Sequence, residues 1–395
     1  MNKFARKLFS VLLLMTFAAL LAEPIAGEEF KTVKDMRGVE VSIPEDPQRV
    51  VAISRGLIDT TMYIFGVEDK LVGGSVTSGD YEDYTYAGET YHVCTQISKV
   101  INPNYQNLTN VGGFGGPYGT VNVETIASLE PDLLILRDFG SADEDVKKFL
   151  DSMEQLEIPA VVLLSQAPGS GSGGDYNDRV DVSTIYEEVR LLGEVFDQQD
   201  EAEEIVEHMD AQVQLIRDRT RDIEEEDKPR VLYFGAPSWA ADRGGTGYAF
   251  GTETIESIFL EDIVNAKNAF DGAATEMIST EHMLALDPDI IILSTYSGYH
   301  PPREMYEADR FEKVQDLMAL EEGRVYSLSA TPVKSERLEF PINLMIEAKA
   351  IYPDRFEDID LEEWIRDYFM GLYDVDEEKA EELMDSLLLR YLEII

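Results

Sequence analysis

Two stretches of the chain share one pattern of apolar and polar positions. The first runs from Val121 to Arg137 (VNVETIASLEPDLLILR) and the second from Ile278 to Ser294 (ISTEHMLALDPDIIILS). Each predicts a short helix, a Pro-Asp break and a buried strand, because proline ends a helix and the apolar run after it is too short for an exposed helix. A repeated helix-turn-strand unit predicts two similar lobes.

The pattern around the first copy predicts a hairpin followed by alternating strands and helices. Residues Phe30–Ile43 alternate on either side of a Met36-Arg37-Gly38 turn, which is typical of a β-hairpin. Strands are then expected at Arg49–Ser54, Leu71–Gly73 and Ala160–Leu164, with a helix at Leu57–Phe65. This alternation predicts a parallel sheet with helices on its faces. Two long loops, Thr77–Pro117 and Ala167–Asp175, are expected to interrupt the lobe.

A helical pattern at Thr184–Ile223 separates the two lobes. Thr184 and Glu187 have the spacing of a capping box, and a break is expected near Phe196–Gln199. The part after the break has an apolar stripe at three- and four-residue spacing and an acidic opposite face. Because a helix of about 20 residues spans roughly 30 Å, we expect a stiff connector between the lobes.

The second lobe opens as the first one does, with a basic residue and an apolar strand at Arg230–Gly235 (RVLYFG). Further elements are expected at Ile255–Leu260, Arg324–Leu328, Pro341–Ile351, Leu361–Tyr373 and Glu377–Ile395. The predicted fold class is therefore α/β, with two Rossmann-like lobes joined by a long rigid α-helix. Its predicted parts are a signal peptide at 1–27, an N-terminal lobe at 28–183, the connecting helix at 184–228 and a C-terminal lobe with a helical C-terminus at 229–395.

The net charge and the N-terminal residues limit which partners and which cellular location the protein can have. The chain has 33 Lys and Arg against 78 Asp and Glu, a net charge of −45, which disfavours nucleic acid as a partner. Three basic residues precede the apolar run Leu8–Ala22, which suits the core of a signal peptide better than a membrane span. We expect an exported protein, with an uncleaved N-terminal anchor as the alternative. No cysteine follows the run, which argues against a bacterial lipoprotein anchor.

Motifs for catalysis or for a bound metal are missing from the sequence. The four histidines, at 92, 208, 282 and 300, have no ligand spacing, and Cys94 is the only cysteine. HExxH, CxxC, EF-hand and GxSxG patterns do not occur. We therefore expect a binding protein without a cofactor rather than an enzyme.

Aromatic and basic residues follow the predicted strands. In a two-lobed α/β protein the ligand lies between the lobes, at the carboxyl ends of the strands. Each such residue could equally be an ordinary surface residue of a loop, but together they would suit a flat or bulky ligand with anionic groups. The candidate ligand-binding residues are Arg55, Phe114, Tyr118, Trp239, Arg243, Tyr296, Tyr299, Lys334 and Arg337.

The order of these motifs resembles a known family. N-V-E-x-I-x-x-L-x-P-D in the first lobe and S-x-E-x-x-x-x-x-x-P-D in the second are similar to the substrate-binding proteins of ABC importers for ferric siderophores, haem and cobalamin. The similarity covers roughly residues 30–375, and Tyr352–Phe356 with Asp358–Asp360 looks like archaeal members.

The resemblance implies a mechanism and its partners. A monomer would capture a metal chelate (a ferric siderophore, haem or a corrinoid) between lobes that close only slightly. It would then dock onto arginines of the membrane permease through one glutamate on each lobe, Glu124 and Glu281 by motif position. The loop Thr77–Pro117 is longer than the family pattern, which leaves the ligand open.

Two other functions fit the same sequence. One is an exported enzyme on a chelatase-like or nitrogenase-like bilobal scaffold that acts on a metal chelate, which would need a clustered His/Cys/Asp site. The other is a cell-surface protein whose loops bind other proteins. Binding of a ferric chelate or a corrinoid would favour the importer function over both.

Overall fold

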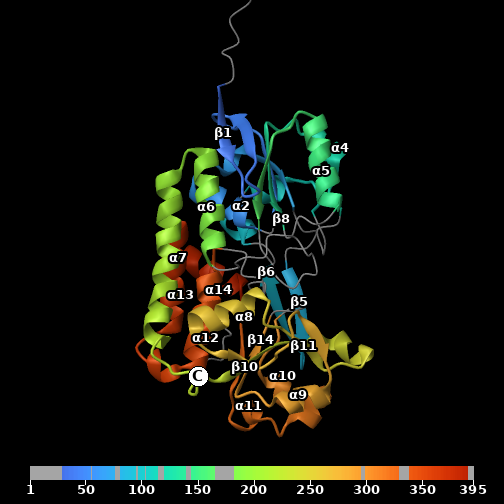
Figure 1. Cartoon of the computed structure of the whole chain (residues 1–395), viewed down its shortest axis with the longest axis vertical. Helices are drawn as coiled ribbons and strands as arrows, with labels where there is room; N and C mark the ends of the chain where they lie inside the picture. The colour runs from blue at the N-terminus through green and yellow to red at the C-terminus, as the bar shows by residue number, and fades with distance from the viewer. Residues whose placement is uncertain are drawn as a thin grey trace, which may run out of the picture.

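The computed structural model describes residues 29–54, 56–75, 81–94, 97–102, 104–113, 120–138, 144–164, 182–294, 299–328 and 338–389. Two α/β lobes lie one above the other along the long axis, and a layer of helices runs beside them (Figure 1). The predicted signal peptide, 1–27, and the glycine-rich stretch Ala167–Asp175 lie outside the described residues. None of the described helices is both long and apolar enough to cross a membrane.

The first lobe is built on a five-stranded parallel sheet with the order β7-β4-β3-β8-β9. Its strands are β3 (Val50–Ile53), β4 (Leu71–Gly74), β7 (Thr109–Asn110), β8 (Leu133–Asp138) and β9 (Ala160–Leu164). Strand β3 is buried along its whole length and β8 is buried from Leu133 to Arg137, as is expected of parallel strands with helices on their faces. The helices of this lobe are α2 (Leu57–Ile64), α4 (Val123–Ser128) and α5 (Glu144–Gln155). The predicted hairpin is confirmed as β1 (Phe30–Lys34) paired with β2 (Glu40–Pro44).

The second lobe has a six-stranded mixed sheet. Its order is β13-β11-β10-β14-β15, with β12 also paired to β10, and β11 and β13 run antiparallel to their neighbours. The strands are β10 (Arg230–Gly235), β11 (Gly247–Ala249), β12 (Lys267–Asn268), β13 (Glu276–Ile278), β14 (Ile290–Leu293) and β15 (Val325–Ser327). Its shorter helices are α8 (Ile255–Phe259), η5 (Leu260–Val264), α9 (Thr280–Leu286), α10 (Arg303–Glu307), η6 (Asp309–Val314) and α11 (Met318–Glu321).

The repeated sequence unit occupies equivalent places in the two sheets. The first copy forms α4 and β8, and the second forms α9 and β14. Strand β8 pairs in parallel with β3, the strand that opens lobe one, and β14 pairs in parallel with β10, the strand that opens lobe two. The prediction of two similar α/β lobes is therefore confirmed.

The connecting segment is a helical hairpin. Helix α6 (Val182–Phe196) runs antiparallel to the 22-residue helix α7 (Gln199–Thr220), and Arg190 of α6 bonds to Glu203 of α7 through both oxygens at 2.7 Å. The predicted break is present, with Asp197 at φ 58 between the helices. The capping box is wrong, because α6 begins at Val182 and Thr184 therefore lies inside the helix.

Helices from the C-terminal part pack beside this connector. They are α12 (Phe340–Ile351), α13 (Leu361–Tyr373) and α14 (Glu377–Ser386), and η7 (Pro353–Arg355) follows α12. One hydrophobic cluster runs from Val50 in lobe one through Val213 of α7 to Tyr233 in lobe two. The lobes therefore share a continuous core along the helical layer.

The stretch predicted as a long loop at Thr77–Pro117 is largely structured, so that prediction is wrong. It contains a two-stranded hairpin, β5 (Tyr81–Tyr86) and β6 (Glu89–Cys94), followed by α3 (Ser98–Ile101), η2 (Tyr105–Asn107) and β7. Ala87 and Gly88, with φ of 50 and 86, make the tight turn of the hairpin. Tyr84 and Tyr86 alternate with polar residues of β5, and Tyr91 lies opposite Tyr84, so these three tyrosines lie on one face of the strand pair.

Candidate functional site

Most of the predicted ligand-binding residues lie outside the described part of the chain. These are Arg55, Phe114, Tyr118, Tyr296, Lys334 and Arg337. Their assignment to the ligand-binding lining stays a prediction. Trp239, Arg243 and Tyr299 are described, and the structure separates them into two groups.

Trp239 and Arg243 form one stack on the surface of lobe two. Both belong to η4 (Ser238–Arg243), which follows the carboxyl end of β10. The guanidinium carbon of Arg243 lies 4.5 Å from the centre of the Trp239 ring, and Trp239 meets Tyr248 edge to face at 5.5 Å. Trp239 and Tyr248 are partly buried and Arg243 is exposed. This arrangement offers an aromatic surface with a positive charge beside it, which suits a flat anionic ligand.

Tyr299 is placed differently from the prediction. Its side chain is only 1 % exposed, and its ring packs against Tyr91 of β6 at 5.2 Å between ring centres. Tyr91 belongs to a stretch that the sequence predicted to be a loop. The sequence alone therefore gave no reason to expect that Tyr91 would cover the ring of Tyr299. The ring contacts protein rather than an open cleft, and we remove Tyr299 from the candidate lining.

A buried polar network beside Tyr299 was missed by the sequence reasoning. His300 and Glu304 are 1 % and 3 % exposed, and His300 Nδ1 lies 2.8 Å from Glu304 Oε2. Arg310 bonds to the other oxygen of Glu304 and donates to the carbonyl of Ala236 at 2.8 Å. The network therefore joins α10 and η6 to the end of β10. Its i, i+4 spacing of His and Glu was the only signal in the sequence.

The charges of this network follow from its contacts. Burial raises the pKa of the Glu304 carboxyl, but the hydrogen bond and charge of His300 together with the charge of Arg310 outweigh it, and the net pKa is lowered. Glu304 is therefore a carboxylate at neutral pH. Burial, followed by the hydrogen bond with Glu304, raises the pKa of Tyr84 of the hairpin, which keeps its hydroxyl protonated as a donor.

Glu124 and Glu281 are both exposed, in the first turns of matching helices. Asn122 caps α4 by accepting from Thr125 N at 2.9 Å, and Ser279 caps α9 by accepting from His282 N at 3.2 Å. Glu124 is the second residue of α4 and Glu281 the second residue of α9. A bond from the backbone N–H of Glu281 itself, followed by one from Ser279, lowers the pKa of Glu281, so this carboxylate is charged. Each lobe thus presents one acidic residue at an equivalent place.

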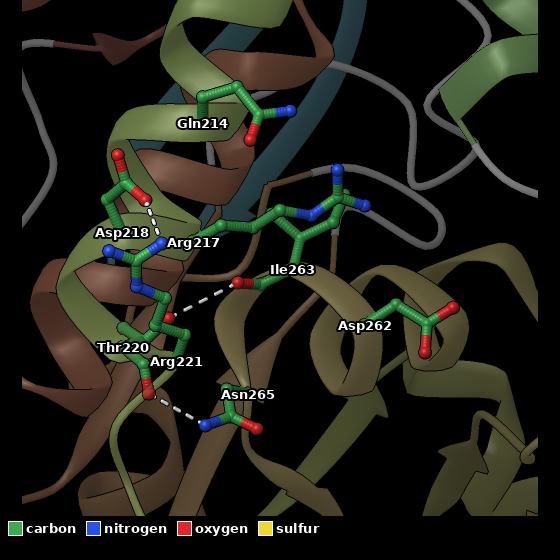
Figure 2. Close-up of a pocket in the computed structure, with 8 residues that line it drawn as sticks. All are labelled: Gln214, Arg217, Asp218, Thr220, Arg221, Asp262, Ile263 and Asn265. Carbon is green, nitrogen blue, oxygen red and sulfur yellow. Dashed lines mark hydrogen bonds and ion pairs between the residues drawn. The ribbon is translucent and has the colours of Figure 1, made fainter.

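A pocket of about 340 Å³ lies at the far end of the connector (Figure 2). It is lined by Gln214, Arg217, Asp218, Thr220, Arg221, Asp262, Ile263 and Asn265. Asn265 precedes β12, whose Lys267 pairs with Arg230 at the start of β10. The pocket therefore lies at the amino end of the second sheet, whereas the predicted cleft lies at the carboxyl ends.

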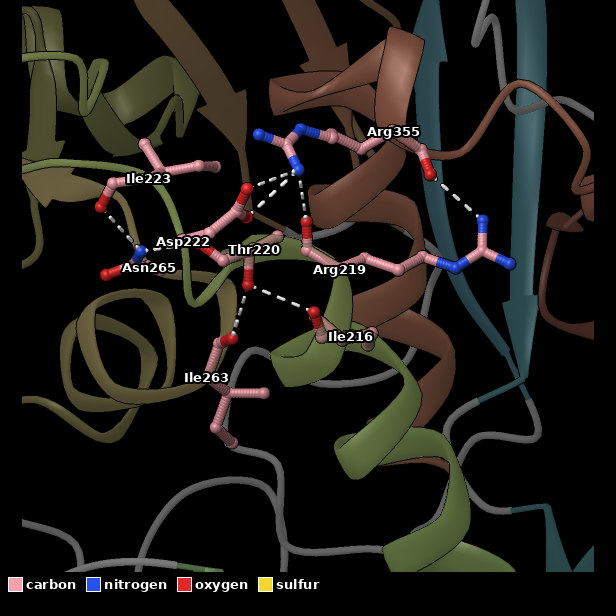
Figure 3. A network of polar contacts seen from close by, with 8 residues as sticks. All are labelled: Ile216, Arg219, Thr220, Asp222, Ile223, Ile263, Asn265 and Arg355. Atoms are coloured by element: carbon pink, nitrogen blue, oxygen red, sulfur yellow. Dashed lines mark hydrogen bonds and ion pairs between the residues drawn. The ribbon is translucent and has the colours of Figure 1, made fainter.

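The segment that looks like archaeal members of the family, Tyr352–Phe356 with Asp358–Asp360, forms hydrogen bonds with the end of α7. Arg355 donates to both oxygens of Asp222 at 2.9 and 3.0 Å, and Arg219 donates to the carbonyl of Arg355 at 2.9 Å (Figure 3). Asp358 accepts from Arg219 and Asp360 caps α13. This part of the motif has a structural role, which is to hold the connector against the C-terminal helices.

Within the described residues no group of three or more His, Cys, Asp or Glu is placed to hold a metal ion. Cys94, the lone cysteine, is 1 % exposed on the hairpin. The described part of the site is therefore defined by aromatic rings, arginines and the two exposed glutamates.

Comparisons with known proteins identify the family and the fold. The family described as "Periplasmic binding protein" matches residues 50–332. An uncharacterised ABC transporter substrate-binding lipoprotein YvrC of Bacillus subtilis is 23% identical over 328 residues, covering 83% of this chain and 87% of its own length. The molybdate-binding protein MolA of Haemophilus influenzae is 22% identical over 385 residues, covering 93% and 97%. The crystal structure of a periplasmic solute-binding protein from Veillonella parvula superposes with a TM-score of 0.68 at 20% identity, covering 92% of this chain and 98% of that one.

Proposed function

Because the chain belongs to the periplasmic binding protein family, we propose that it is the substrate-binding protein of an ABC importer and that it acts outside the cytoplasm. It acts as a monomer, captures an iron chelate of the siderophore type, haem or a corrinoid between its lobes, and delivers it to the permease. The enzyme on a bilobal scaffold is not retained, because the relatives of this chain are substrate-binding proteins.

The observation that carries this proposal is the equivalent placement of Glu124 and Glu281. Both are exposed, and each stands in the first turn of a helix that leads directly into a buried central strand. Strands β8 and β14 hold the two carboxylates at a fixed spacing, as docking onto two arginines of a permease requires. Helix N-termini favour acidic residues in general, but that preference alone does not explain why a glutamate occupies the same exposed position in both copies of the repeat.

The ligand class rests on the stack of Trp239 and Arg243. An aromatic face with a neighbouring guanidinium suits a bulky anionic chelate. The residues Arg55, Phe114, Tyr118, Tyr296, Lys334 and Arg337 belong to the same proposed lining. The name of one relative states molybdate binding, so molybdate is the ligand to test against the chelates.

The test uses the two tryptophans of the chain, Trp239 and Trp364. Purified protein is titrated with ferric siderophores, haem, cobalamin and molybdate while tryptophan fluorescence is recorded. We expect one of the chelates to quench the emission at micromolar concentration or below. Trp239→Phe should remove most of the quenching, because the responding indole is gone, and should weaken binding by up to about tenfold, because the smaller ring keeps only part of the stacked area.

Trp364→Phe is the matched control. Trp364 stacks on Tyr368 of α13 at 5.6 Å between ring centres, within the helical layer. This variant should keep both the quenching and the affinity. Quenching that depends on Trp364, or tight binding of molybdate with no response to any chelate, would refute the proposed ligand class.

A further inference from the structure

The β5–β6 hairpin belongs to lobe one by sequence but packs on lobe two. In chain order it lies between β4 and β7, two neighbouring strands of the first sheet. It leaves that sheet and lies in the lower half of the molecule (Figure 1), where it contacts α10. No described strand of either large sheet pairs with it. Its position is therefore set by side-chain contacts.

Aromatic rings make the buried part of the contact. Tyr84 lies 4.2 Å from His300 and Tyr91 lies 5.2 Å from Tyr299, between ring centres. Tyr84 and Tyr91 are directly opposite each other in the hairpin register, so they share one face. Tyr91 is 5 % exposed and both lobe-two partners are 1 % exposed. Tyr91, Tyr299 and His300 are therefore buried in the contact, and Tyr84 is partly buried.

Arg303 of α10 adds a polar anchor near the turn of the hairpin. Its Nη2 donates to Glu89 Oε2 at 2.6 Å and to the Tyr91 hydroxyl at 2.9 Å. Its guanidinium also lies over the Tyr86 ring at 5.6 Å, and the Tyr86 hydroxyl donates to Glu307 at 3.3 Å. The same arginine therefore contacts both strands.

The opposite face of the hairpin has none of these contacts with lobe two. It carries Asp83 bonded to His92 at 2.8 Å and Thr85 bonded to Thr90 at 2.9 Å, and all four residues are exposed. Between Asp83 and His92 the hairpin is therefore two-faced, with aromatic residues toward lobe two and polar residues outward. A two-stranded hairpin is only marginally stable in water by itself, so its order depends on this contact.

We propose that the β5–β6 hairpin is a clasp that joins the two lobes, with Arg303 as the residue that positions it. The clasp and the helical layer hold the lobes at two separate places. The lobes consequently keep one separation with and without ligand, and the ligand enters a cleft of preset width. The role of the clasp in ligand entry rests on the proposed function. The joining of the two lobes by the hairpin does not.

The first test is amide hydrogen exchange on the full chain without any ligand. Arg303→Glu places a carboxylate beside Glu89 and Glu307, so the anchor becomes repulsive. We expect exchange in β5 and β6 to rise at least about tenfold while β10 and β14 stay protected, since the hairpin would detach locally. Asp83→Ala, on the outward face of the same hairpin, is the control and should leave the exchange unchanged.

The second test measures the distance between the lobes. Spin labels at exposed Glu154 of α5 and Glu321 of α11, each changed to cysteine, report the separation by pulsed electron resonance. Every protein in this test also carries Cys94→Ala, because Cys94 lies on β6 and would be open to labelling once the hairpin detached. The distance distribution should broaden in Arg303→Glu and not in Asp83→Ala. If both the exchange and the distances of Arg303→Glu match those of the unsubstituted chain, there is no clasp. Because no ligand is used, this result leaves the proposed function unaffected.

Discussion

Two aspartates show why the sequence repeat exists. Asp132 accepts from the backbone N–H groups of Gln48 and Arg49 at 2.7 and 2.9 Å, and Asp289 accepts from the N–H of Arg230 at 2.7 Å. Each aspartate follows the proline of its copy and ties the start of its strand to the strand that opens the lobe. The Pro-Asp pair therefore has a structural function, which is to satisfy backbone donors at the amino ends of the central strands β3 and β10.

Glu347 gives a residue-scale prediction about pH. This residue of α12 is 3 % exposed, and burial raises the pKa of its carboxyl to about 8, opposed by a hydrogen bond with Tyr233 and supported by the charge of Glu256. Unfolded Glu347 ionises near its ordinary value while the folded residue stays protonated. The free energy of unfolding should therefore fall with rising pH, by about 1.4 kcal/mol per pH unit from this group, until the pH passes the folded pKa.

Glu347→Gln should remove this contribution. Urea unfolding of both proteins between pH 5.5 and 9 would show the stability of the variant gaining on the unsubstituted chain up to about pH 8 and levelling off above it. Exposed Glu154→Gln is the control and should give parallel curves. Parallel curves for Glu347→Gln would mean that its carboxyl titrates as it does in the unfolded chain.

At the scale of elements, two ion pairs with similar geometry differ in burial. Arg137 of β8 donates to both oxygens of Glu188 of α6 at 2.6 Å, and their side chains are 2% and 0% exposed. Arg190 and Glu203 bond in the same way at 2.7 Å between α6 and α7, with both side chains 47% exposed. The first pair fixes α6 on the sheet of lobe one, and the second lies across the helical hairpin.

Removal of each arginine should separate these roles. Arg137→Ala deprives buried Glu188 of two charged bonds and should lower the free energy of unfolding by about 3–5 kcal/mol. Arg190→Ala should cost less than about 1 kcal/mol, because solvent screens the exposed pair. Urea unfolding at neutral pH measures both. Equal losses would show that burial does not decide the contribution of these pairs.

Most elements could be predicted from sequence, and the exceptions are those whose place depends on contacts with a distant part of the chain. Buried strands such as Arg230–Gly235 and the repeated helices are predicted by their own periodicity. The β5–β6 hairpin also has the required alternation and an Ala87-Gly88 turn, but its tyrosines look like loop aromatics unless the partner surface is known. The fold-back of α6 onto α7 likewise depends on packing between two different helices, whose buried apolar residues belong to one hydrophobic cluster.

At the scale of the whole molecule, two features limit the relative motion of the lobes. The hydrophobic cluster continues from lobe one through α7 into lobe two, and α14 packs against both β6 and α3. Lys379 of α14 also donates to the carbonyl of Val100 at 3.1 Å. A shared core resists hinge motion because opening it would expose apolar surface. We therefore expect the spacing of Glu124 and Glu281 to be almost independent of the ligand.

Simultaneous charge reversal tests this docking pair. Glu124→Arg with Glu281→Arg should lower ligand uptake by the cognate importer at least about tenfold, because like charges would meet at the permease, and should leave ligand affinity within about twofold. The control, Glu154→Arg with Glu321→Arg, makes the same change of net charge on exposed helices of the two lobes. Loss of affinity, or uptake equal to that of the control, would contradict the docking assignment.

The sequence by itself determined the two lobes, their main parallel strands and the positions of Glu124 and Glu281, because these follow from short-range periodicity and from a repeat. Only the tertiary structure decided what the hairpin covers and why Tyr299 is buried. These depend on contacts between distant residues, such as the bond from Tyr86 to Glu307 across 221 positions of the chain. No local pattern encodes such a contact, since it forms only when both lobes have folded.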